Sequence, residues 1–247
     1  MPQKPRVLHK DPHVIAVHKP AGWVVYPEPG DSAPSAKDWA EKRVNRKIHP
    51  VHRLDKDTSG ILIFALDPPT AADLIRDFSR QKVKKTYLAW VEGDHPSEAA
   101  YRTPLAKKGK KPEPALTLCR KVYVDDPDSE SDALDDEHWE VEGEEDDESG
   151  PKADRLPGPP RTLLEINPKT GRYHQIRRHL AQAKFPIVGD RVYGPGARRS
   201  KGGGKQSSPG LRLCLCAVGL EFTHPRTKQR LNIRTKAEFL RLVTSRR

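Results

Sequence analysis

The sequence predicts a globular fold in which β-strands and α-helices both contribute to the core. Short apolar runs bounded by turn-forming residues are typical of strands, and other segments combine an N-cap residue with helical spacing of apolar side chains. The chain has 247 residues, of which 34% are hydrophobic. This length is sufficient for one large domain or for two lobes that share a core.

The most distinct strand is expected at residues 61–66, whose sequence is ILIFAL. Gly60 precedes this run and an Asp-Pro-Pro sequence follows it, and half of its residues are β-branched or aromatic. The polar residues 52–59 therefore lie at the entrance of a buried strand, where binding and catalytic side chains are often displayed. Asp55 is the first candidate for chemistry.

The other expected elements follow in chain order. A helix is predicted over residues 35–44 with Ser35 as its cap, and a second helix is predicted to open at Thr70 with Asp73 in the capping-box position. A final helix is predicted to begin at Thr235. Further strands are expected at residues 7–8, 14–17, 86–91, 116–124, 161–166, 211–222 and 231–234.

Segments rich in proline, glycine or lysine are predicted to be loops. Lys19 and Trp23 lie in a kinked Pro/Gly segment, which predicts surface positions and structural roles for both. Residues 99–114 are rich in lysine and proline and are also predicted to form a loop. Residues 197–205, ARRSKGGGK, predict a flexible basic loop that either clamps a phosphate backbone, which we favour slightly, or is a tolerated insertion.

The charge of the chain is unevenly distributed. It has 45 Lys and Arg against 34 Asp and Glu, a net charge of +11. Residues 125–149 contain 15 of the acidic residues and no Lys or Arg, so the other 222 residues have 45 basic and 19 acidic side chains, a net +26. Such an excess attracts phosphate backbones by counterion release and favours a nucleic-acid partner over a merely soluble surface.

The acidic segment itself, residues 125–160, is predicted to be a disordered insertion between two strands. A segment with charges of one sign and few large apolar residues buries too little surface to fold alone. It either mimics nucleic acid and competes for the basic surface, or is a solvated loop; we favour the solvated loop.

The cysteines and the hydropathy pattern indicate the compartment. Cys119, Cys214 and Cys216 form no even framework, so reduced core residues are expected. The N-terminus leads into no apolar signal segment, and no stretch approaches the length of a membrane span. We therefore expect a cytoplasmic protein without a membrane partner.

A second dense polar stretch covers residues 168–180, PKTGRYHQIRRHL. Its Thr-Gly pair predicts a turn, and Ile176 and Leu180 then follow helical spacing. Arg177, near the start of this helix, is well placed to face a carboxylate from another strand. His174 and His179 lack a third ligand at metal spacing, so a metal site is disfavoured.

Four of these stretches together resemble the motifs of the RluA-type RNA pseudouridine synthases, in the order of that family. They are HRLDKDTSG at 52–60, KTYLA at 85–89, TGRYHQIR at 170–177 and PIVGD at 186–190. The resemblance covers about residues 6–235, nearly the whole chain. The first and third motifs are long enough to make chance agreement very improbable.

The resemblance implies an α+β fold, with a mixed, mostly antiparallel sheet bent around a central active-site cleft and helices packed outside. It implies a single catalytic domain over residues 6–247, without the N-terminal RNA-binding domain that many relatives carry. The implied function is isomerisation of specific uridines to pseudouridine in rRNA or tRNA. A monomer is the default expectation.

The same resemblance implies roles for individual residues. Asp55 is the catalytic carboxylate, Arg177 pairs with it, and Tyr87 lies against the uracil ring. Ile176 lines the pocket, and Arg53 occupies the space that the uridine leaves in the RNA. The other candidates for contact with the substrate or RNA, all in the same motifs, are His52, Thr58, Arg172 and His174.

The implied reaction is consistent with the residues present. It breaks the N1–C1′ bond, turns the uracil and joins C5 to C1′ without redox change, so neither a metal nor a nucleotide cofactor is expected. The carboxylate either attacks C1′ or removes the C2′ proton, and a guanidinium beside it favours its charged form. The target base is expected to flip out of the RNA. Rival functions are an inactive RNA-binding protein on the same scaffold and an RNA glycosidase.

Overall fold

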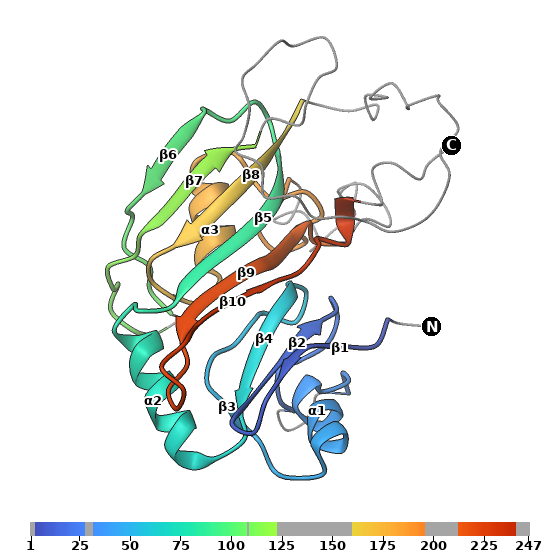
Figure 1. Ribbon diagram of the computed structural model, residues 1–247. Coiled ribbons are helices and arrows are strands. Elements are labelled where there is room, and N and C mark those ends of the chain that lie inside the picture. The colour runs from blue at the N-terminus through green and yellow to red at the C-terminus, as the bar shows by residue number, and fades with distance from the viewer. Residues whose placement is uncertain (1–2, 28–31, 108, 123–159, 196–211, 241–247) are drawn as a thin grey trace, which may run out of the picture.

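The computed structural model describes residues 3–27, 32–107, 109–122, 160–195 and 212–240 (Figure 1). All but the last residue of the expected acidic insertion, and all of the expected basic loop at 197–205, lie outside these residues. The described helices are α1 (Ala36–Val44), α2 (Pro68–Ser79) and α3 (Gln175–Gln182). The described strands are β1 (Arg6–Lys10), β2 (Val14–Lys19), β3 (His49–Pro50), β4 (Ser59–Ala65), β5 (Lys84–Glu92), β6 (Glu98–Tyr101), β7 (Thr117–Lys121), β8 (Arg161–Pro168), β9 (Leu215–Thr223) and β10 (Arg230–Arg234).

These strands form one mixed, mostly antiparallel sheet, which confirms the predicted α+β fold class. Its order is β1-β2-β4-β9-β5-β8-β7-β6, with β3 added to β4 and β10 added to β9 (Figure 1). Among the described strands, only β4 and β9 pair in parallel. This pairing joins an N-terminal half, β1–β4 with α1 and α2, to a C-terminal half, β5–β10 with α3.

Gly60 is required at this junction. Its φ is +112°, and a Cβ atom there would lie 2.2 Å from the Ala217 carbonyl oxygen of β9. Only two residue pairs, Ser59↔Cys216 and Gly60↔Ala217, form the parallel register. The two halves of the sheet therefore meet at a backbone contact that has no room for a side chain.

The N-terminal half is a sheet covered by helices on both faces. Alternate residues of β4 enter different apolar clusters: Ile61 and Ile63 pack in the cluster that contains Leu74 of α2, whereas Leu62 and Phe64 pack in the cluster that contains Ala40 of α1. Because both faces of β4 are buried, the strand is apolar at consecutive positions rather than alternating. This explains why residues 61–66 gave such a distinct strand pattern.

In the C-terminal half, α3 lies against β7 and β8 (Figure 1). Leu180 of α3 shares an apolar cluster with Ile166 of β8 and with Cys119, Cys214 and Cys216, all buried. The three cysteines are free thiols in the core. Packing of Leu180 against the sheet fixes the helix whose first turn carries Arg177.

The start of α2 differs from the prediction. The helix begins at Pro68, and Asp67 rather than Thr70 is its N-cap, with its side chain accepting a hydrogen bond from the Thr70 N–H at 2.8 Å. A proline in the first turn, where no N–H partner is needed, indicates the same boundary. The Asp73 carboxylate does not complete a capping box but pairs with Arg76 and Arg226.

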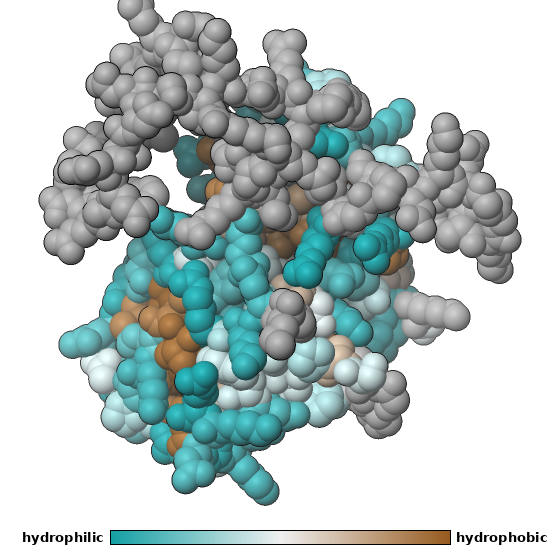
Figure 2. All heavy atoms as spheres, turned by 90° about the vertical axis from the view of Figure 1, so that its right-hand side faces the viewer, coloured by the Kyte–Doolittle hydropathy of each residue, from teal (hydrophilic) through white to brown (hydrophobic). Residues whose placement is uncertain are grey.

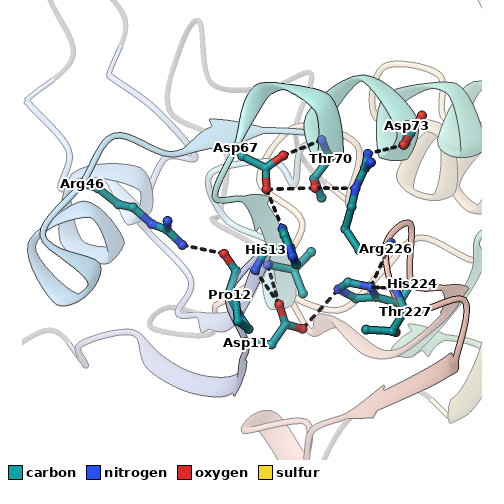
Figure 3. Close-up of polar contacts among 11 residues, drawn as sticks. Asp11, Pro12, His13, Arg46, Asp67, Thr70, Asp73, His224, Arg226 and Thr227 are labelled. Carbon is teal, nitrogen blue, oxygen red and sulfur yellow. Dashed lines mark hydrogen bonds and ion pairs between the residues drawn. The ribbon is translucent and has the colours of Figure 1, made fainter.

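A polar cluster ties the two halves together at the end of the sheet where α2 begins (Figure 3). Asp67 accepts a hydrogen bond from His13 at 2.9 Å, and Arg226 donates to the Thr70 hydroxyl at 3.2 Å. Asp11, in the β1–β2 turn, lies 3.3 Å from His224 of the β9–β10 turn. Three turns from distant parts of the sequence are thereby held against one another.

Other predictions need adjustment. Residues 99–114 are not wholly a loop, because Glu98–Tyr101 forms β6 and pairs with β7. The final helix was expected to begin at Thr235, but residues 235–238 are not helical; only residues 239–240 are described as helix, and residues 241–247 lie outside the described part. No helix among the described residues is long and apolar enough to cross a membrane. Figure 2 shows one face of the molecule whose described atoms are mostly hydrophilic, with hydrophobic residues visible as a brown strip and as separate smaller brown patches.

Candidate active site

A cleft of about 570 Å³ opens where the two halves of the sheet meet. This volume is within the usual range for small-molecule sites. Three segments line it: the turn before β4, the start of β5, and the loop that leads into α3. The lining includes all nine residues that the sequence analysis singled out: His52, Arg53, Asp55, Thr58, Tyr87, Arg172, His174, Ile176 and Arg177.

Asp55 lies in a tight turn directly before β4. The Thr58 N–H donates to the Asp55 carbonyl oxygen at 3.1 Å, which closes the turn. The Asp55 side chain is 22% exposed, and its Oδ2 lies 3.6 Å from Nη1 of Arg177 and 3.7 Å from Nε2 of His174. The carboxylate therefore faces the cleft with two basic groups beside it.

Arg177 is held chiefly by a residue to which the sequence analysis gave no role. Its Nε and Nη2 donate to the two carboxylate oxygens of Asp190 at 2.8 and 2.9 Å. Arg177 is 3% exposed and Asp190 2% exposed. The expected partnership with Asp55 is therefore the weaker of two contacts, since the two-point bond goes to Asp190 and only Nη1 is directed toward Asp55.

The Asp190 carboxylate is further fixed by the backbone N–H groups of Val192 and Tyr193, at 2.9 and 3.0 Å. Burial acts to raise the pKa of Asp190, but the hydrogen bonds from Arg177 and from the backbone hold that pKa below its ordinary value. The pKa of Arg177 is raised, because the bond to Asp190 outweighs the effect of burial. Arg177 thus provides a fixed positive charge beside Asp55.

Lys19 contradicts the prediction of a surface position. It is fully buried at the end of β2, and its Nζ donates to the carbonyl oxygens of Trp23 at 2.8 Å, Lys56 at 3.1 Å and Pro20 at 3.3 Å. Burial lowers the pKa of Lys19 to about 7, although the charges of Asp55 and Asp57 oppose this shift. The ammonium group thereby braces the turn that carries Asp55.

Tyr87 is placed by β5, which lies between β8 and β9. It pairs with Ile166 on one side and Ala217 on the other. Burial, together with the nearby Asp55 charge, raises the pKa of the Tyr87 phenol, so the group is neutral near pH 7. Ile176 and Leu215, both buried, add apolar surface to the same cleft.

Two further predicted residues are neutral groups at the cleft. His52 stacks on Phe78, with ring centroids 4.6 Å apart, and its Nε2 accepts a hydrogen bond from the Ile63 N–H at 2.9 Å. Burial lowers the pKa of His52 to about 3, with the Lys85 charge adding to the effect. The Thr58 hydroxyl is buried and has no hydrogen-bond partner among the described residues.

The turn that leads into α3 is held by Gln175, which the sequence analysis did not single out. Its Oε1 accepts from the Thr170 hydroxyl at 2.6 Å and from the Arg172 N–H at 3.0 Å. Its Nε2 donates to Leu116 O and to the Thr117 hydroxyl, each at 3.0 Å. The buried amide uses all of its hydrogen-bonding capacity to place the start of α3 against β7.

The two arginines predicted to contact RNA at the mouth of the cleft differ in their ion-pair partners. Arg172 forms an ion pair with Glu113 and donates to Pro114 O at 3.1 Å, so it holds the segment before β7. Any contact of Arg172 with RNA would compete with these bonds. Arg53 is exposed, and its guanidinium has no ion-pair partner among the described residues. His179, by contrast, is buried and held by Thr117 and Thr103.

Comparison with known proteins identifies the class of this site. A family model described as RNA pseudouridylate synthase matches residues 13–182, which include the turn with Asp55, the β5 tyrosine and the arginine of α3. The protein is thus an isomerase that acts on RNA.

Individual relatives agree. The tRNA pseudouridine synthase C of Vibrio vulnificus is 30% identical over 256 residues, covering 94% of this chain and 90% of that protein. The protein of the same name from Haemophilus ducreyi is 32% identical over 231 residues, covering 92% and 88%. The structure of human RNA Pseudouridylate Synthase Domain Containing 1 has the same fold, with a TM-score of 0.67 at 21% identity over 97% of this chain and 86% of that one. The chain belongs to the RluA-type RNA pseudouridine synthase family, as its motifs implied.

Proposed function

We propose that this enzyme converts a uridine of tRNA to pseudouridine, with Asp55 as the catalytic carboxylate and without a cofactor. The choice of tRNA rests on the bacterial relatives, which are named tRNA pseudouridine synthase C. The net charge of +26 outside residues 125–149 supports binding to an RNA backbone. Ribosomal RNA is the alternative substrate.

The observation that carries the proposal is the setting of Asp55. Its side chain is 22% exposed in the cleft and lies 3.6 Å from a guanidinium that a second carboxylate holds in place. A positive charge at this distance favours the ionised carboxylate, which both routes require. In one route a carboxylate oxygen bonds to C1′ as the N1–C1′ bond breaks, and this ester bond breaks when C5 bonds to C1′. In the other route the carboxylate takes the C2′ proton as the N1–C1′ bond breaks, and it returns that proton to C2′ when C5 bonds to C1′.

The detached uracil must then turn without leaving. The Tyr87 ring, with Ile176 and Leu215, gives it apolar surface to lie against, while C5 turns toward C1′. When C5 bonds to C1′, the C5 proton is released, and N1 gains a proton in its place.

The phenol of Tyr87 has a restricted part in the proton transfers. Because its pKa is raised by burial and by Asp55, little phenolate is present near neutral pH. Tyr87 is therefore proposed as a surface for the uracil and not as the base that takes the C5 proton. The neutral His52 ring, stacked on Phe78, is proposed to contact the substrate through shape and not through charge.

A uridine stacked within an RNA does not reach this cleft, so we infer that the enzyme flips it. Flipping costs on the order of a few kcal/mol in lost stacking and pairing. Arg53 is exposed at the mouth and lacks an ion-pair partner among the described residues, so its guanidinium is suited to fill the vacated space.

The test is incubation of transcribed tRNA and rRNA with the wild-type enzyme, with Asp55→Asn and with Asp57→Asn, followed by mapping of pseudouridine. Asp57 is an exposed carboxylate in the same turn and provides the matched control. Asp55→Asn is expected to lower turnover by at least about a thousandfold, since it removes the nucleophile or general base. Asp57→Asn is expected to stay within about threefold of wild type.

Each outcome separates the proposal from its rivals. Full activity of Asp55→Asn contradicts the assigned role, and modification of rRNA alone contradicts the assigned substrate. Loss of RNA mass by release of free uracil indicates a glycosidase. Binding of RNA without any change in it indicates an inactive scaffold.

A further inference from the structure

Tyr173 is an exposed aromatic residue at the mouth of the cleft. Its side chain is 48% exposed, and it lines the same cleft as Asp55 and Tyr87. One face of its ring stacks on the His174 ring, with centroids 3.8 Å apart and an interplanar angle of 18°. Since the inner face is covered by His174, the exposed area belongs to the outer face and edges of the ring.

The backbone of His174 makes this stack possible. His174 adopts a left-handed conformation, with φ of 51°, directly before α3, and this uncommon geometry sets the direction of its ring. Its Nδ1 lies 3.1 Å from the Tyr193 hydroxyl, and its Nε2 lies 3.7 Å from the Asp55 carboxylate. Tyr173 is thus the outer ring of a fixed stack whose inner ring contacts the proposed catalytic carboxylate.

The surroundings of Tyr173 suit a nucleic acid. The exposed Lys169 lines the same cleft and provides positive charge for the phosphates of a bound strand. Aromatic side chains with one open face bind unstacked bases with little dependence on base identity. A ring that is already stacked on its inner side loses little conformational freedom when a base covers its outer side.

We propose that Tyr173 is a stacking site for the nucleobase next to the target uridine. This inference rests on the proposed function: when the uridine turns into the cleft, its neighbour loses a stacking partner at the mouth. Tyr173 replaces that partner, so the base, Tyr173 and His174 form a continuous stack, in that order, with His174 next to Asp55. The site takes a purine or pyrimidine base in a single-stranded or opened part of the RNA.

The test is a double-mutant cycle in which one change is made in the enzyme and the other in the RNA substrate. Semi-synthetic substrates carry an abasic ribonucleotide either directly 5′ or directly 3′ of the uridine mapped for the wild type. Rates come from tritium release from 5-tritiated uridine, because the C5 hydrogen leaves when C5 joins C1′. Tyr173→Ala and Tyr173→Phe are compared with Tyr26→Ala, a change at an exposed tyrosine outside the cleft lining.

On intact RNA, Tyr173→Ala is expected to raise KM about tenfold, the effect of losing one base–aromatic stack, with kcat changed less than about threefold. Tyr173→Phe is expected to keep KM within about twofold, because the phenyl face still stacks. One of the two abasic substrates is expected to raise the wild-type KM by a similar factor and to cause no further loss in Tyr173→Ala. Tyr26→Ala is expected to match wild type on every substrate.

The inference is overturned if the enzyme and RNA changes are additive for both abasic positions, or if Tyr173→Phe is as impaired as Tyr173→Ala. Either result is obtained with a wild-type enzyme that still forms pseudouridine, so it leaves the proposed function intact. A wild type that forms no pseudouridine in any RNA contradicts the proposed function and removes the basis of the stacking site as well.

Discussion

The two walls of the cleft hold their charged groups in different ways. On the N-terminal wall, Asp55 sits in a turn fixed by backbone hydrogen bonds and by Lys19, and its own side chain is 22% exposed. On the C-terminal wall, Arg177 is 3% exposed and bound at two points by Asp190. The comparison shows that the proposed catalytic carboxylate of Asp55 is accessible, while the neighbouring Arg177 guanidinium is immobilised by its own partner, Asp190.

The largest effect on stability is expected from Asp190→Asn. This change leaves the Arg177 guanidinium buried without its counter-charge, which typically costs about 3–5 kcal/mol of unfolding free energy. Turnover should fall as well, because Arg177 is then free to move toward Asp55 or away from it. Urea unfolding at pH 7 and tritium release measure the two effects.

Asp73→Asn is the matched control, since Asp73 forms ion pairs with Arg76 and Arg226 outside the cleft lining. Partly exposed pairs of this kind contribute about 0–1 kcal/mol. Equal loss of stability in the two variants would show that the C-terminal wall does not depend on the buried pair.

The pKa of Asp190 is held below its ordinary value, so its contribution to stability is present above about pH 4 and is lost as the pH falls through the folded-state pKa.

The next largest effect concerns the junction between the walls. Gly60→Ala should lower the unfolding free energy by about 3 kcal/mol, because the new Cβ would lie 2.2 Å from Ala217 O at a φ of +112°. Gly22→Ala is the control, since its φ of +87° is also left-handed but no atom lies within 4 Å of the added Cβ. Gly22→Ala should cost only about 1 kcal/mol in thermal or urea unfolding. Equal costs would contradict the close approach of β4 and β9.

A smaller, pH-dependent effect is expected from Lys19→Met on the N-terminal wall. Burial lowers the folded-state pKa of Lys19 to about 7 from 10.5, so between these values the unfolded chain binds more protons and wild-type stability rises with pH. At pH 8.5 the variant should be less stable by about 2 kcal/mol, because it loses the neutral amine, whose two N–H groups can donate to two of the three surrounding carbonyl oxygens. The difference should shrink toward pH 7.

Urea unfolding at pH 7 and pH 8.5 measures this difference, with the exposed Lys42→Met in α1 as the control. A wild-type minus Lys19→Met difference that is the same at both pH values would contradict the lowered pKa. It would leave the hydrogen bonds to the turn as the whole contribution of Lys19.

The smallest effect is expected from Tyr87→Phe, between the two walls. If the ring serves mainly as a surface for the uracil, removal of the hydroxyl should lower kcat by less than about tenfold, which is 1.4 kcal/mol. Tyr87→Leu, which removes the ring, should cost more. A loss with Tyr87→Phe as large as that with Asp55→Asn would instead assign the C5 proton to the phenol.

The sequence analysis predicted structure and site residues best where the local residue pattern directly reflects burial or a family motif. Residues 61–66 were identified as a strand because both faces of β4 are buried, so the apolar run is continuous. The motifs around Asp55 and Arg177 were enough to identify the family and to select nine residues that line one cleft. Here the relevant information lies within short stretches of the chain.

The prediction failed where the deciding partner lies elsewhere in the sequence. Lys19 can be buried because carbonyl oxygens of two turns, those of Trp23 and Lys56, accept hydrogen bonds from its Nζ. No local pattern near residue 19 indicates that these acceptors lie beside it. The strong partner of Arg177 is Asp190, in a turn beyond the end of α3, so helical spacing pointed only to an unspecified carboxylate. Asp67 was missed as the N-cap of α2 because Thr70 and Asp73 also fit the capping-box pattern, which placed the predicted start of the helix too late in the chain.

The parallel contact between β4 and β9 has a consequence for the order of events during synthesis. Residues 59–60 can meet their partners at 216–217 only after the ribosome has synthesised the chain through residue 217. Contacts between such distant positions form late and slowly in folding. A nascent or truncated polypeptide that has Asp55 but not β9 therefore lacks the strand that completes the cleft, and we expect competence to modify RNA only once residues 216–217 are present.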